Sequence, residues 1–289
     1  MNWCIVYLAS PRSFGRHEIL KASLRIAKKC FPSTDIYVFH EDYTDQDFGD
    51  LPSIKEAIRV DFSGHDDVYN PATGRRKGYL LMCRFFCGIL QSTPQLQSYS
   101  HYMRLDDDSF FLEPYPAETH IQRMLQQDYT FRTLFLEEQS QQSLYEFTIA
   151  FLKRNGVGHL TLIQIKSALT SARFLYEGRY TGLAPYNNFH MSSLRMWKHP
   201  LVVRYLQEIE SIGGILRYGW LDANVHAMIV YVLSQVASLR VLQELWFGYR
   251  HNTHVSPLGR KGAWMDLTLQ PYPDTSGFNT VDYHTTNTQ

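Results

Sequence analysis

The chain has 289 residues and a formal net charge of zero, because 28 Lys and Arg residues balance 28 Asp and Glu residues. A neutral chain has no bulk attraction for nucleic acid or anionic membranes, which excludes partners selected by overall charge. Its hydrophobic fraction of 44% is ample for a large core. The four cysteines are too scattered for a disulfide scaffold, no apolar stretch reaches the roughly 18 residues of a membrane span, and the N-terminus lacks a basic signal region. We therefore expect a soluble protein from a reducing compartment.

The first 62 residues predict a strand–helix–strand unit. Cys4–Leu8 is a short β-rich apolar run, and apolar residues then recur at helical spacing over Ile19–Ala27 until Pro32 stops the helix. Asp35–His40 predicts a second strand and Ile58–Phe62 a third. Strands and a helix of these lengths, in this order, predict a parallel sheet and an α/β fold.

The rest of the chain continues the alternation up to an irregular C-terminal tail. Helices are predicted at Tyr79–Leu90, Glu118–Gln127, Leu144–Arg154, Leu160–Leu175, Leu201–Ile212 and Asp222–Val236, and strands at Tyr102–Leu105 and Tyr129–Leu136. Asp222 is expected to cap the last helix. From His251 onward the chain is rich in Gly, Pro and Thr and predicts little core. We expect one domain over residues 1–289.

Three consecutive carboxylates, Asp106–Asp108, follow the predicted strand at Tyr102–Leu105. Like charges this close raise one another's pKa unless a cation offsets them. In extended chain Asp106 and Asp108 point to the same side, so together they could hold one hard divalent ion while Asp107 points elsewhere. Such a site at the edge of a parallel sheet suits a metal-bound diphosphate. A solvated acidic turn is the alternative, and the apolar residues on both sides make it less favoured.

Two classes of enzyme place carboxylates in this pattern at a strand end. A nucleotide-sugar transferase uses the metal to neutralise the departing diphosphate, whereas a phosphohydrolase uses the first aspartate, here Asp106, as a nucleophile. In the phosphohydrolase pattern the aspartates normally follow the first strand. Here they lie about 100 residues into the chain and continue with Ser109 and Phe110. The position therefore favours transfer from a nucleotide sugar.

Five ordered segments resemble a known family. They are Tyr79–Phe86 (YLLMCRFF), Tyr102–Glu113 (YMRLDDDSFFLE), Tyr186–His190 (YNNFH), Gly213–Met228 (GGILRYGWLDANVHAM) and Phe247–His251 (FGYRH). They resemble, in the same order, segments of the fungal α-1,2-mannosyltransferases of glycosyltransferase family 15. Five ordered segments are far more specific than the aspartate cluster alone.

The resemblance implies an α/β fold of the GT-A type, which is Rossmann-like, with a mostly parallel central sheet flanked by helices. It also implies a nucleotide-sugar donor and Mn²⁺, with Mg²⁺ as the alternative ion. Carried over by position, the metal ligands would be Asp106, Asp108 and His251. A neutral imidazole added to carboxylates is a plausible Mn²⁺ shell. Without the resemblance, His251 beside Arg250 would be interpreted as a surface histidine.

The resemblance also divides the chain into halves with separate roles. Residues 1–112 would form the nucleotide-binding half, 113–255 the acceptor-binding half, and 256–289 an irregular tail. Residues near the donor or acceptor sugar would be Tyr186, Asn187, His190 and Trp220. The alternative for the YNNFH segment is a turn with a packed aromatic side chain.

Basic and strand-end residues supply candidates for the nucleotide. Lys77 and Arg84 could contact the diphosphate, since guanidinium pairs well with phosphate oxygens, although Arg84 could instead be a structural partner of the acidic cluster. The end of the first strand would line the nucleotide, through Tyr7, Ala9, Ser10 and Arg12.

Two departures from the family pattern concern catalysis. The family's glutamate after the YNNFH-like segment, proposed to act at the anomeric carbon, falls on Leu194–Met196, where no carboxylate stands. The glutamate before the metal-binding aspartate is replaced by the shorter Asp106. Asp222 is retained, and at the start of a predicted helix it could serve as a general base on the acceptor hydroxyl. The missing glutamate leaves a retaining or an inverting reaction open.

The sequence thus predicts a metal-dependent glycosyltransferase that moves a sugar from a nucleotide diphosphate to a glycan hydroxyl. GDP-mannose is the donor favoured by resemblance, and a UDP-sugar, as in an inverting xylosyltransferase, is the close alternative. A phosphohydrolase and a catalytically inactive glycan-binding relative are the rival classes. No nucleic acid partner or membrane span is expected. The lack of an anchor predicts either a cytoplasmic enzyme or the Golgi-lumen catalytic part of an anchored one.

Overall fold

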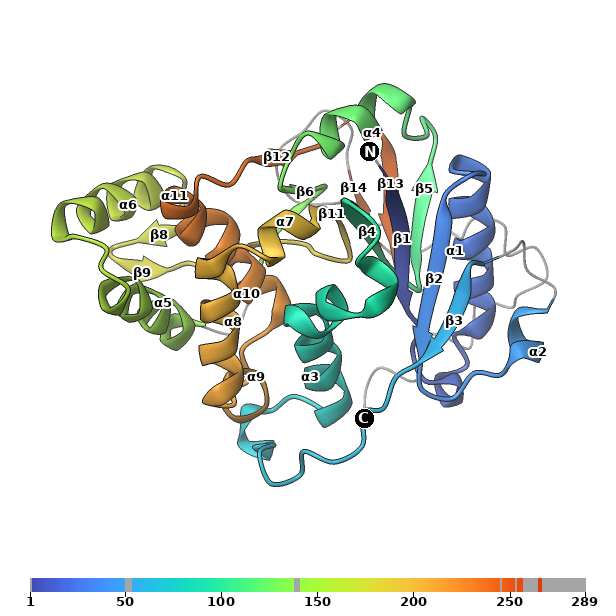
Figure 1. Ribbon diagram of the computed structural model, residues 1–289, viewed down its shortest axis with the longest axis horizontal. Helices are drawn as coiled ribbons and strands as arrows, with labels where there is room; N and C mark the ends of the chain where they lie inside the picture. Colours follow the sequence, from blue (N-terminus) through green and yellow to red (C-terminus); the bar gives the residue numbers. More distant parts are fainter. Residues whose placement is uncertain are drawn as a thin grey trace.

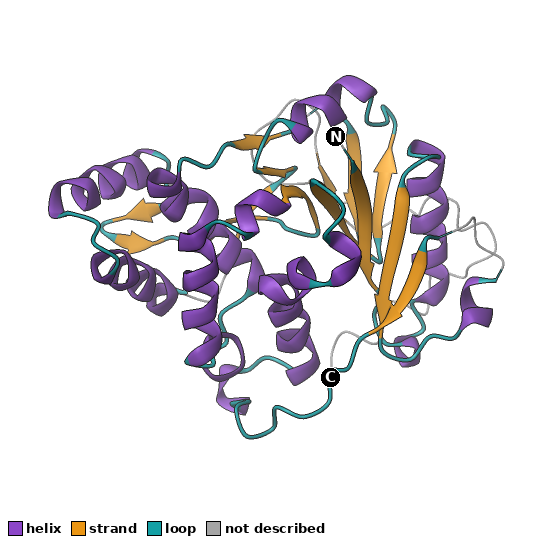
Figure 2. Cartoon of the chain, in the orientation of Figure 1, coloured by secondary structure: helices purple, strands orange, loops and turns teal. Residues whose placement is uncertain are grey.

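The computed structural model describes residues 2–49, 54–137, 141–244 and 246–252, together with short strands at 254–256 and 265–266. Within these residues the centre is a seven-stranded sheet in the order β12-β6-β11-β4-β1-β2-β3, with helices on both faces (Figures 1 and 2). Neighbouring strands are parallel except for the two pairs made by β11. The predicted α/β architecture with a mostly parallel sheet is confirmed.

The first half of the chain builds the parallel part of the sheet. Its elements are β1 (Trp3–Leu8), α1 (His17–Cys30), β2 (Asp35–His40), α2 (Asp45–Phe48), β3 (Glu56–Arg59), α3 (Lys77–Arg84), β4 (His101–Asp106) and β5 (Ser109–Leu112). β1 lies between β2 and β4, in register with both, so the chain crosses the sheet between β3 and β4. β1, α1 and β2 agree with the prediction from periodicity, whereas β3 overlaps the strand expected at Ile58–Phe62 only at residues 58 and 59.

The second half closes the sheet and adds helices. Its elements are α4 (Glu118–Leu125), β6 (Tyr129–Phe131), β7 (Leu134–Leu136), α5 (Gln142–Arg154), α6 (His159–Ser171), β8 (Leu175–Tyr176), β9 (Arg179–Tyr180), β10 (Leu183–Pro185), β11 (Phe189–Ser193), α7 (Leu194–Trp197), α8 (Pro200–Ser211), α9 (Gly214–Tyr218), α10 (Asp222–Ala227), α11 (Ser234–Ala237), β12 (Val241–Gln243), β13 (Gly248–His251), β14 (His254–Ser256) and β15 (Met265–Asp266). The helices α5 and α6, with β8 and β9, project at the left of Figure 1.

The sheet separates two cores because successive side chains of a strand point to opposite faces. Cys4 and Val6 pack with α3, α8 and α10 on one face, whereas Ile5 and Tyr7 pack with α1 and α4 on the other. Arg104 in β4 pairs with Val6 of β1, so it shares the face of α3 and α10. This alternation fixes the direction of the charged residues at the end of β4.

Three predictions of single elements are corrected. The run from Tyr129 to Leu136 forms two strands in different sheets, β6 and β7, rather than one. The helix at Tyr79–Leu90 ends its α-helical part at Arg84 and continues as a π-helical turn, inside which Gly88 has a φ of 123° that only glycine adopts easily. Asp222 is the first residue of α10, while Leu221 holds the cap position with no side-chain cap bond.

The segment expected to be an irregular tail contains ordered strands at its beginning. β13 pairs with β5 and β14, and β15 pairs with β14, in a four-stranded antiparallel sheet. His251 ends β13 opposite Ser109, which brings it beside the aspartate cluster. Most of the predicted tail at 256–289 lies outside the described residues. Within the described part, every helix is too short or too polar to cross a membrane.

Candidate active site at the end of β4

The three aspartates occupy the point where β4 leaves the central sheet. Asp106 is the last residue of β4, and Asp107 and Asp108 form the turn into β5. Asp107 turns toward α1, where it accepts a hydrogen bond from the Ser10 backbone amide at 2.9 Å and pairs with Arg16 at 2.8 Å. Arg16 also forms an ion pair with Asp108. Asp107 therefore points toward the segment before α1, and the turn at residues 107–108 sets this direction rather than the extended chain expected from the sequence.

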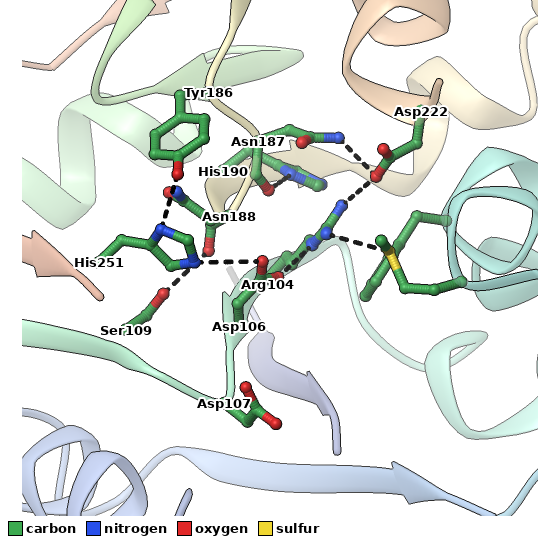
Figure 3. A network of polar contacts seen from close by, with 12 residues as sticks. Arg104, Asp106, Asp107, Ser109, Tyr186, Asn187, Asn188, His190, Asp222 and His251 are labelled. Carbon is green, nitrogen blue, oxygen red and sulfur yellow. Dashed lines mark hydrogen bonds and ion pairs between the residues drawn. The ribbon is translucent and has the colours of Figure 1, made fainter. Parts of the chain in front are cut away.

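His251 lies over Asp106 and Asp108. Its Nε2 is 2.9 Å from Asp108 Oδ1 and 3.7 Å from Asp106 Oδ2. Its Nδ1 shares a hydrogen bond of 2.8 Å with the Tyr186 hydroxyl (Figure 3). The Asn252 backbone amide donates to the carbonyl of Asp108, which joins the end of β13 to the turn after β4. The sheet pairing and this bond hold the imidazole against the carboxylates.

A buried arginine links Asp106 to Asp222. Arg104 donates from Nε to Asp106 Oδ1 at 2.9 Å and from one terminal nitrogen to Asp222 Oδ2 at 2.7 Å (Figure 3). Asn187 donates to the same Asp222 oxygen at 2.8 Å. The guanidinium carbon lies 3.4 Å from the centre of the Phe86 ring, so an aromatic face covers the cation.

The charges of this cluster are set by burial and by their partners. Burial raises the pKa of Asp222, but Arg104 more than offsets it, so the pKa lies below the usual range and the carboxylate is ionised. Burial likewise opposes ionisation of Asp108, whose pKa His251 and Arg16 hold low. Burial lowers the pKa of His251, and the two carboxylates reverse that effect and raise it. In the absence of another cation, a proton on His251 balances the acids.

The donor set fits a divalent ion. Among the described residues, no group of three His, Cys, Asp or Glu side chains is arranged so that it could hold a metal ion as it stands. Asp106, Asp108 and His251 nevertheless converge, and the buried Asp108 Oδ1 makes no hydrogen bond although the imidazole nitrogen is near. A metal ion would satisfy that oxygen and replace the proton of His251. Two carboxylates and an imidazole suit Mn²⁺ or Mg²⁺, and the bond to Tyr186 orients the ring from its other nitrogen.

The match to a family model covers most of the chain. The model is that of the glycolipid 2-alpha-mannosyltransferases, and it matches residues 51–275. The chain belongs to this family. The match includes the aspartate cluster, the YNNFH segment, Asp222 and His251, which are the residues that the structure brings together.

Curated relatives support the same family. The probable mannosyltransferase KTR2 of Saccharomyces cerevisiae is 24% identical over 227 residues, which cover 72% of this chain and 52% of that protein. The O-glycoside alpha-1,2-mannosyltransferase homolog 2 of Schizosaccharomyces pombe is 24% identical over 191 residues, which cover 65% of this chain and 50% of that protein. The chain thus spans about half the length of the curated relatives it matches.

Solved structures share the fold. Core-mannan synthase A from Aspergillus fumigatus, in its Mn/GDP form, superimposes with a TM-score of 0.70 at 16% identity, covering 94% of this chain and 80% of that one. The mannosyltransferase Ktr4p from S. cerevisiae in complex with GDP gives 0.67 at 16% identity, covering 89% and 73%. At this identity the likeness establishes the fold, which is that of GT-A glycosyltransferases.

Of the four residues expected near a sugar, two lie at the cluster and two lie in the core. Tyr186 is half-buried against His251, and Asn187 holds Asp222. His190 is fully buried between Asn187 and the Tyr102 hydroxyl. Trp220 is 3% exposed and donates its indole N–H to Ser143. Both side chains are enclosed by packed neighbours in this structure, and their contact with a sugar stays a prediction.

The residues expected to line the nucleotide differ in their exposure and in their contacts. Tyr7 faces the core under α1, where its hydroxyl bonds to Ser23 at 3.0 Å, so its side chain does not line a nucleotide site. Ala9 is also buried, and Ser10 contributes its backbone amide to Asp107. The Arg12 side chain is half-exposed and pairs with Asp47 of α2 at 3.0 Å.

The two basic residues expected at the diphosphate pair elsewhere in the structure. Lys77 forms an ion pair of 2.6 Å with Asp66. Arg84 pairs with Glu210 of α8 at 2.6 Å and contacts His65. Arg84 is therefore a structural partner of α8. The alternative expectation, that Arg84 is a structural partner of the aspartate cluster, is wrong.

The position of the family's missing glutamate lies far from the aspartates. β11 runs antiparallel to β4, with Phe189 opposite Leu105 and Ser193 opposite His101. The helix α7, which contains Leu194–Met196, follows the far end of β11. The absence of a carboxylate there therefore removes no group from the cluster around Asp106.

Sequence reasoning missed the two arginines that organise the site. Arg104 is 1% exposed and joins Asp106 to Asp222, and Arg16 joins Asp107 to Asp108. A signal for Arg104 was present, since a charged residue within a buried strand requires a partner. Arg16 precedes α1 in a loop and carried no comparable signal.

Proposed function

We propose that this chain is a metal-dependent glycosyltransferase that transfers mannose from GDP-mannose to a hydroxyl of a glycan. The observation that carries the proposal is the convergence of Asp106, Asp108 and His251 at the end of β4, beside the buried pair of Arg104 and Asp222. Family membership and the sheet support it. On this proposal residues 1–112 hold the nucleotide and 113–255 provide the acceptor side.

Asp106, Asp108 and His251 would hold the Mn²⁺ or Mg²⁺ ion. When bound, the ion neutralises charge that develops on the departing diphosphate. Arg16 contacts Asp107 and Asp108 and keeps both acids in place on the side of α1. Tyr186 fixes the orientation of the His251 ring. These side chains are therefore preorganised before a donor arrives.

Asp222 is our candidate for the base that accepts the proton of the acceptor hydroxyl. Its carboxylate is ionised because Arg104 offsets the cost of burial, and Asn187 and Arg104 fix its orientation through Oδ2. A lowered pKa makes a weak base, so proton transfer would accompany breaking of the sugar–phosphate bond rather than precede it. Arg104 is a positioning residue: it lies between Asp222 and Asp106 and holds both carboxylates through hydrogen bonds.

The experiment that tests the proposal is a screen of nucleotide sugars for thermal stabilisation with and without Mn²⁺, followed by transfer assays with radiolabelled donors. We expect GDP-mannose and GDP to raise the melting temperature only with the ion, since a ligand that binds the folded state alone stabilises it. Stabilisation by a UDP-sugar and not by GDP-mannose would contradict the proposed donor. Release of phosphate from small phosphoesters without sugar transfer would show a phosphohydrolase and contradict the proposed enzyme class.

A further inference from the structure

A cavity lies at the end of the central sheet opposite to the aspartate cluster. It lies where β4, β6 and β12 begin and where β11 ends, and its volume is about 650 Å³. β4 spans six residues from His101 at this edge to Asp106 at the other. At roughly 3.3 Å per residue, the two sites are about 17 Å apart along the strand. The cavity is therefore separate from the proposed catalytic site.

Three cationic side chains contribute to the lining. Arg195, Lys198 and Arg240 face one carboxylate, Asp128, so the lining carries two excess positive charges with histidines neutral. Lys198 and Arg240 are exposed, and in the described part of the chain no ion pair is recorded for either side chain. This concentration of charge contrasts with the neutral total of the chain.

Both carboxylate oxygens of Asp128 already have partners, so Asp128 does not neutralise the side chains of Lys198 and Arg240. One of its oxygens accepts from the Ser193 hydroxyl at 3.0 Å and pairs with Arg195 at 2.6 Å, and the other accepts from the Arg240 backbone amide at 2.9 Å. The aspartate is 1% exposed, so it acts as a buried anchor that holds the segments carrying Arg195 and Arg240 at the cavity. Asp128 thus fixes the Arg195 side chain and the backbone of Arg240 beside the cavity.

The rest of the lining is largely apolar. Tyr99, Leu125, Leu194 and Pro200 contribute to it. The cavity is open to solvent, and it combines an apolar wall with exposed cations at its rim, which suits a small anionic ligand. The charges select an anion, and guanidinium groups match the geometry of phosphate oxygens.

We propose that this cavity binds the phosphate group of a small phosphate monoester, with Lys198 and Arg240 as its principal contacts and the carbon skeleton of the ligand against the apolar wall. The phosphate could be carried by a sugar or by a nucleoside, and the two share the same recognition. The site does not depend on the proposed catalytic function, because none of its lining belongs to the aspartate cluster.

The test is calorimetric titration of the full chain with mannose 6-phosphate, GMP and inorganic phosphate in buffer with EDTA. The test variant is Lys198→Glu/Arg240→Glu, and the matched control is Lys166→Glu/Arg173→Glu, which makes the same change of charge at exposed positions on and beside α6. We expect at least tenfold weaker binding of the tightest probe in the test variant and unchanged binding in the control. Asp108→Asn should leave this binding intact.

Each outcome has a defined meaning. Tighter binding of mannose 6-phosphate identifies a sugar phosphate, and tighter binding of GMP identifies a nucleotide, provided that the affinity falls in the test variant. Absence of saturable binding by any probe, equal losses in both double variants, or a loss in Asp108→Asn equal to that in the test variant would overturn the proposal. If the charge reversals lower the melting temperature, Lys198→Ala/Arg240→Ala provides the same comparison without introducing repulsion.

Discussion

Replacement of Arg104 by methionine tests whether the buried arginine is the element that organises the site. The change keeps the unbranched inner part of the side chain but removes the guanidinium, which is the cation between Asp106 and Asp222 and also the group that lies over the Phe86 ring. Asp222 is only 3% exposed, so its charge would be left buried without its partner. Breaking a buried ion pair on one side costs about 3–5 kcal/mol. Asp106 is 28% exposed at its side chain and can turn to water, so most of the cost should come from Asp222.

The pH dependence of this loss is a second readout. In the wild-type chain the pKa of Asp222 is lowered below its usual 3.8, so its stabilisation is complete above that value and is lost as pH falls through the folded pKa. Without Arg104, burial acts unopposed by that cation and raises the pKa. The penalty of Arg104→Met should therefore be largest near pH 7 and should shrink as pH falls toward 4.

Urea unfolding at pH 7 and pH 5 measures both effects. The double variant Arg104→Met/Asp222→Asn removes the stranded charge and should recover at least about 2 kcal/mol of the loss. The matched control is Arg154→Met, which breaks an exposed pair with Glu208 at a similar 2.6 Å and should cost no more than about 1 kcal/mol. The reasoning is refuted if Arg104→Met costs no more than the control, or if Asp222→Asn fails to recover stability.

Three further predictions concern the site and the core. Asp108→Asn should weaken Mn²⁺-dependent GDP binding at least tenfold in calorimetry while far-UV circular dichroism stays unchanged; equal affinity would remove Asp108 from the metal site. Asp222→Ala should retain GDP binding and lower the rate of transfer at least a hundredfold, on the order of general-base contributions, and near-normal turnover would exclude it as the base. Burial, only partly offset by Asp222, lowers the pKa of His226 to about 4, so the neutral form is favoured in the fold. Its contribution is complete above pH 6.5 and falls as pH drops toward 4, by about 2 kcal/mol between pH 6.5 and 5. Urea unfolding of His226→Gln should show a flatter pH dependence than the wild type, and identical slopes would contradict this assignment.

Periodicity was sufficient for elements whose burial is decided locally. α1 shows a continuous apolar face and a stop at Pro32, and β2 coincides with the predicted strand at Asp35–His40. It failed where tertiary pairing decides the structure. The run at Tyr129–Leu136 has uniform strand character, yet Tyr129 pairs with β11 and β12 while Leu134 pairs with β10, so one pattern serves two sheets.

The net charge of zero for the whole chain conceals local clusters of charged residues. The sequence alone located one of these clusters, the three aspartates. Three adjacent aspartates after a strand repel one another in any fold, so Asp106–Asp108 indicated a cation site without a structure. The identity of the local cations depended on tertiary structure. Lys77 and Arg84 were reasonable candidates by composition, but α3 directs them to Asp66 and Glu210. Instead, β4 brings Arg104 to the acids, and the loop before α1 brings Arg16.

The sequence by itself determined the fold class, the family and the aspartate cluster, because strand and helix periods and adjacent charges are properties of neighbouring residues. Only the tertiary structure decided which distant groups meet there. His251 reaches Asp108 because β13 pairs with β5, and Asp222 reaches Arg104 because alternate residues of β4 face α10. Sequence separations of 143 and 118 residues are closed by sheet pairing and helix packing, whose register no local pattern specifies.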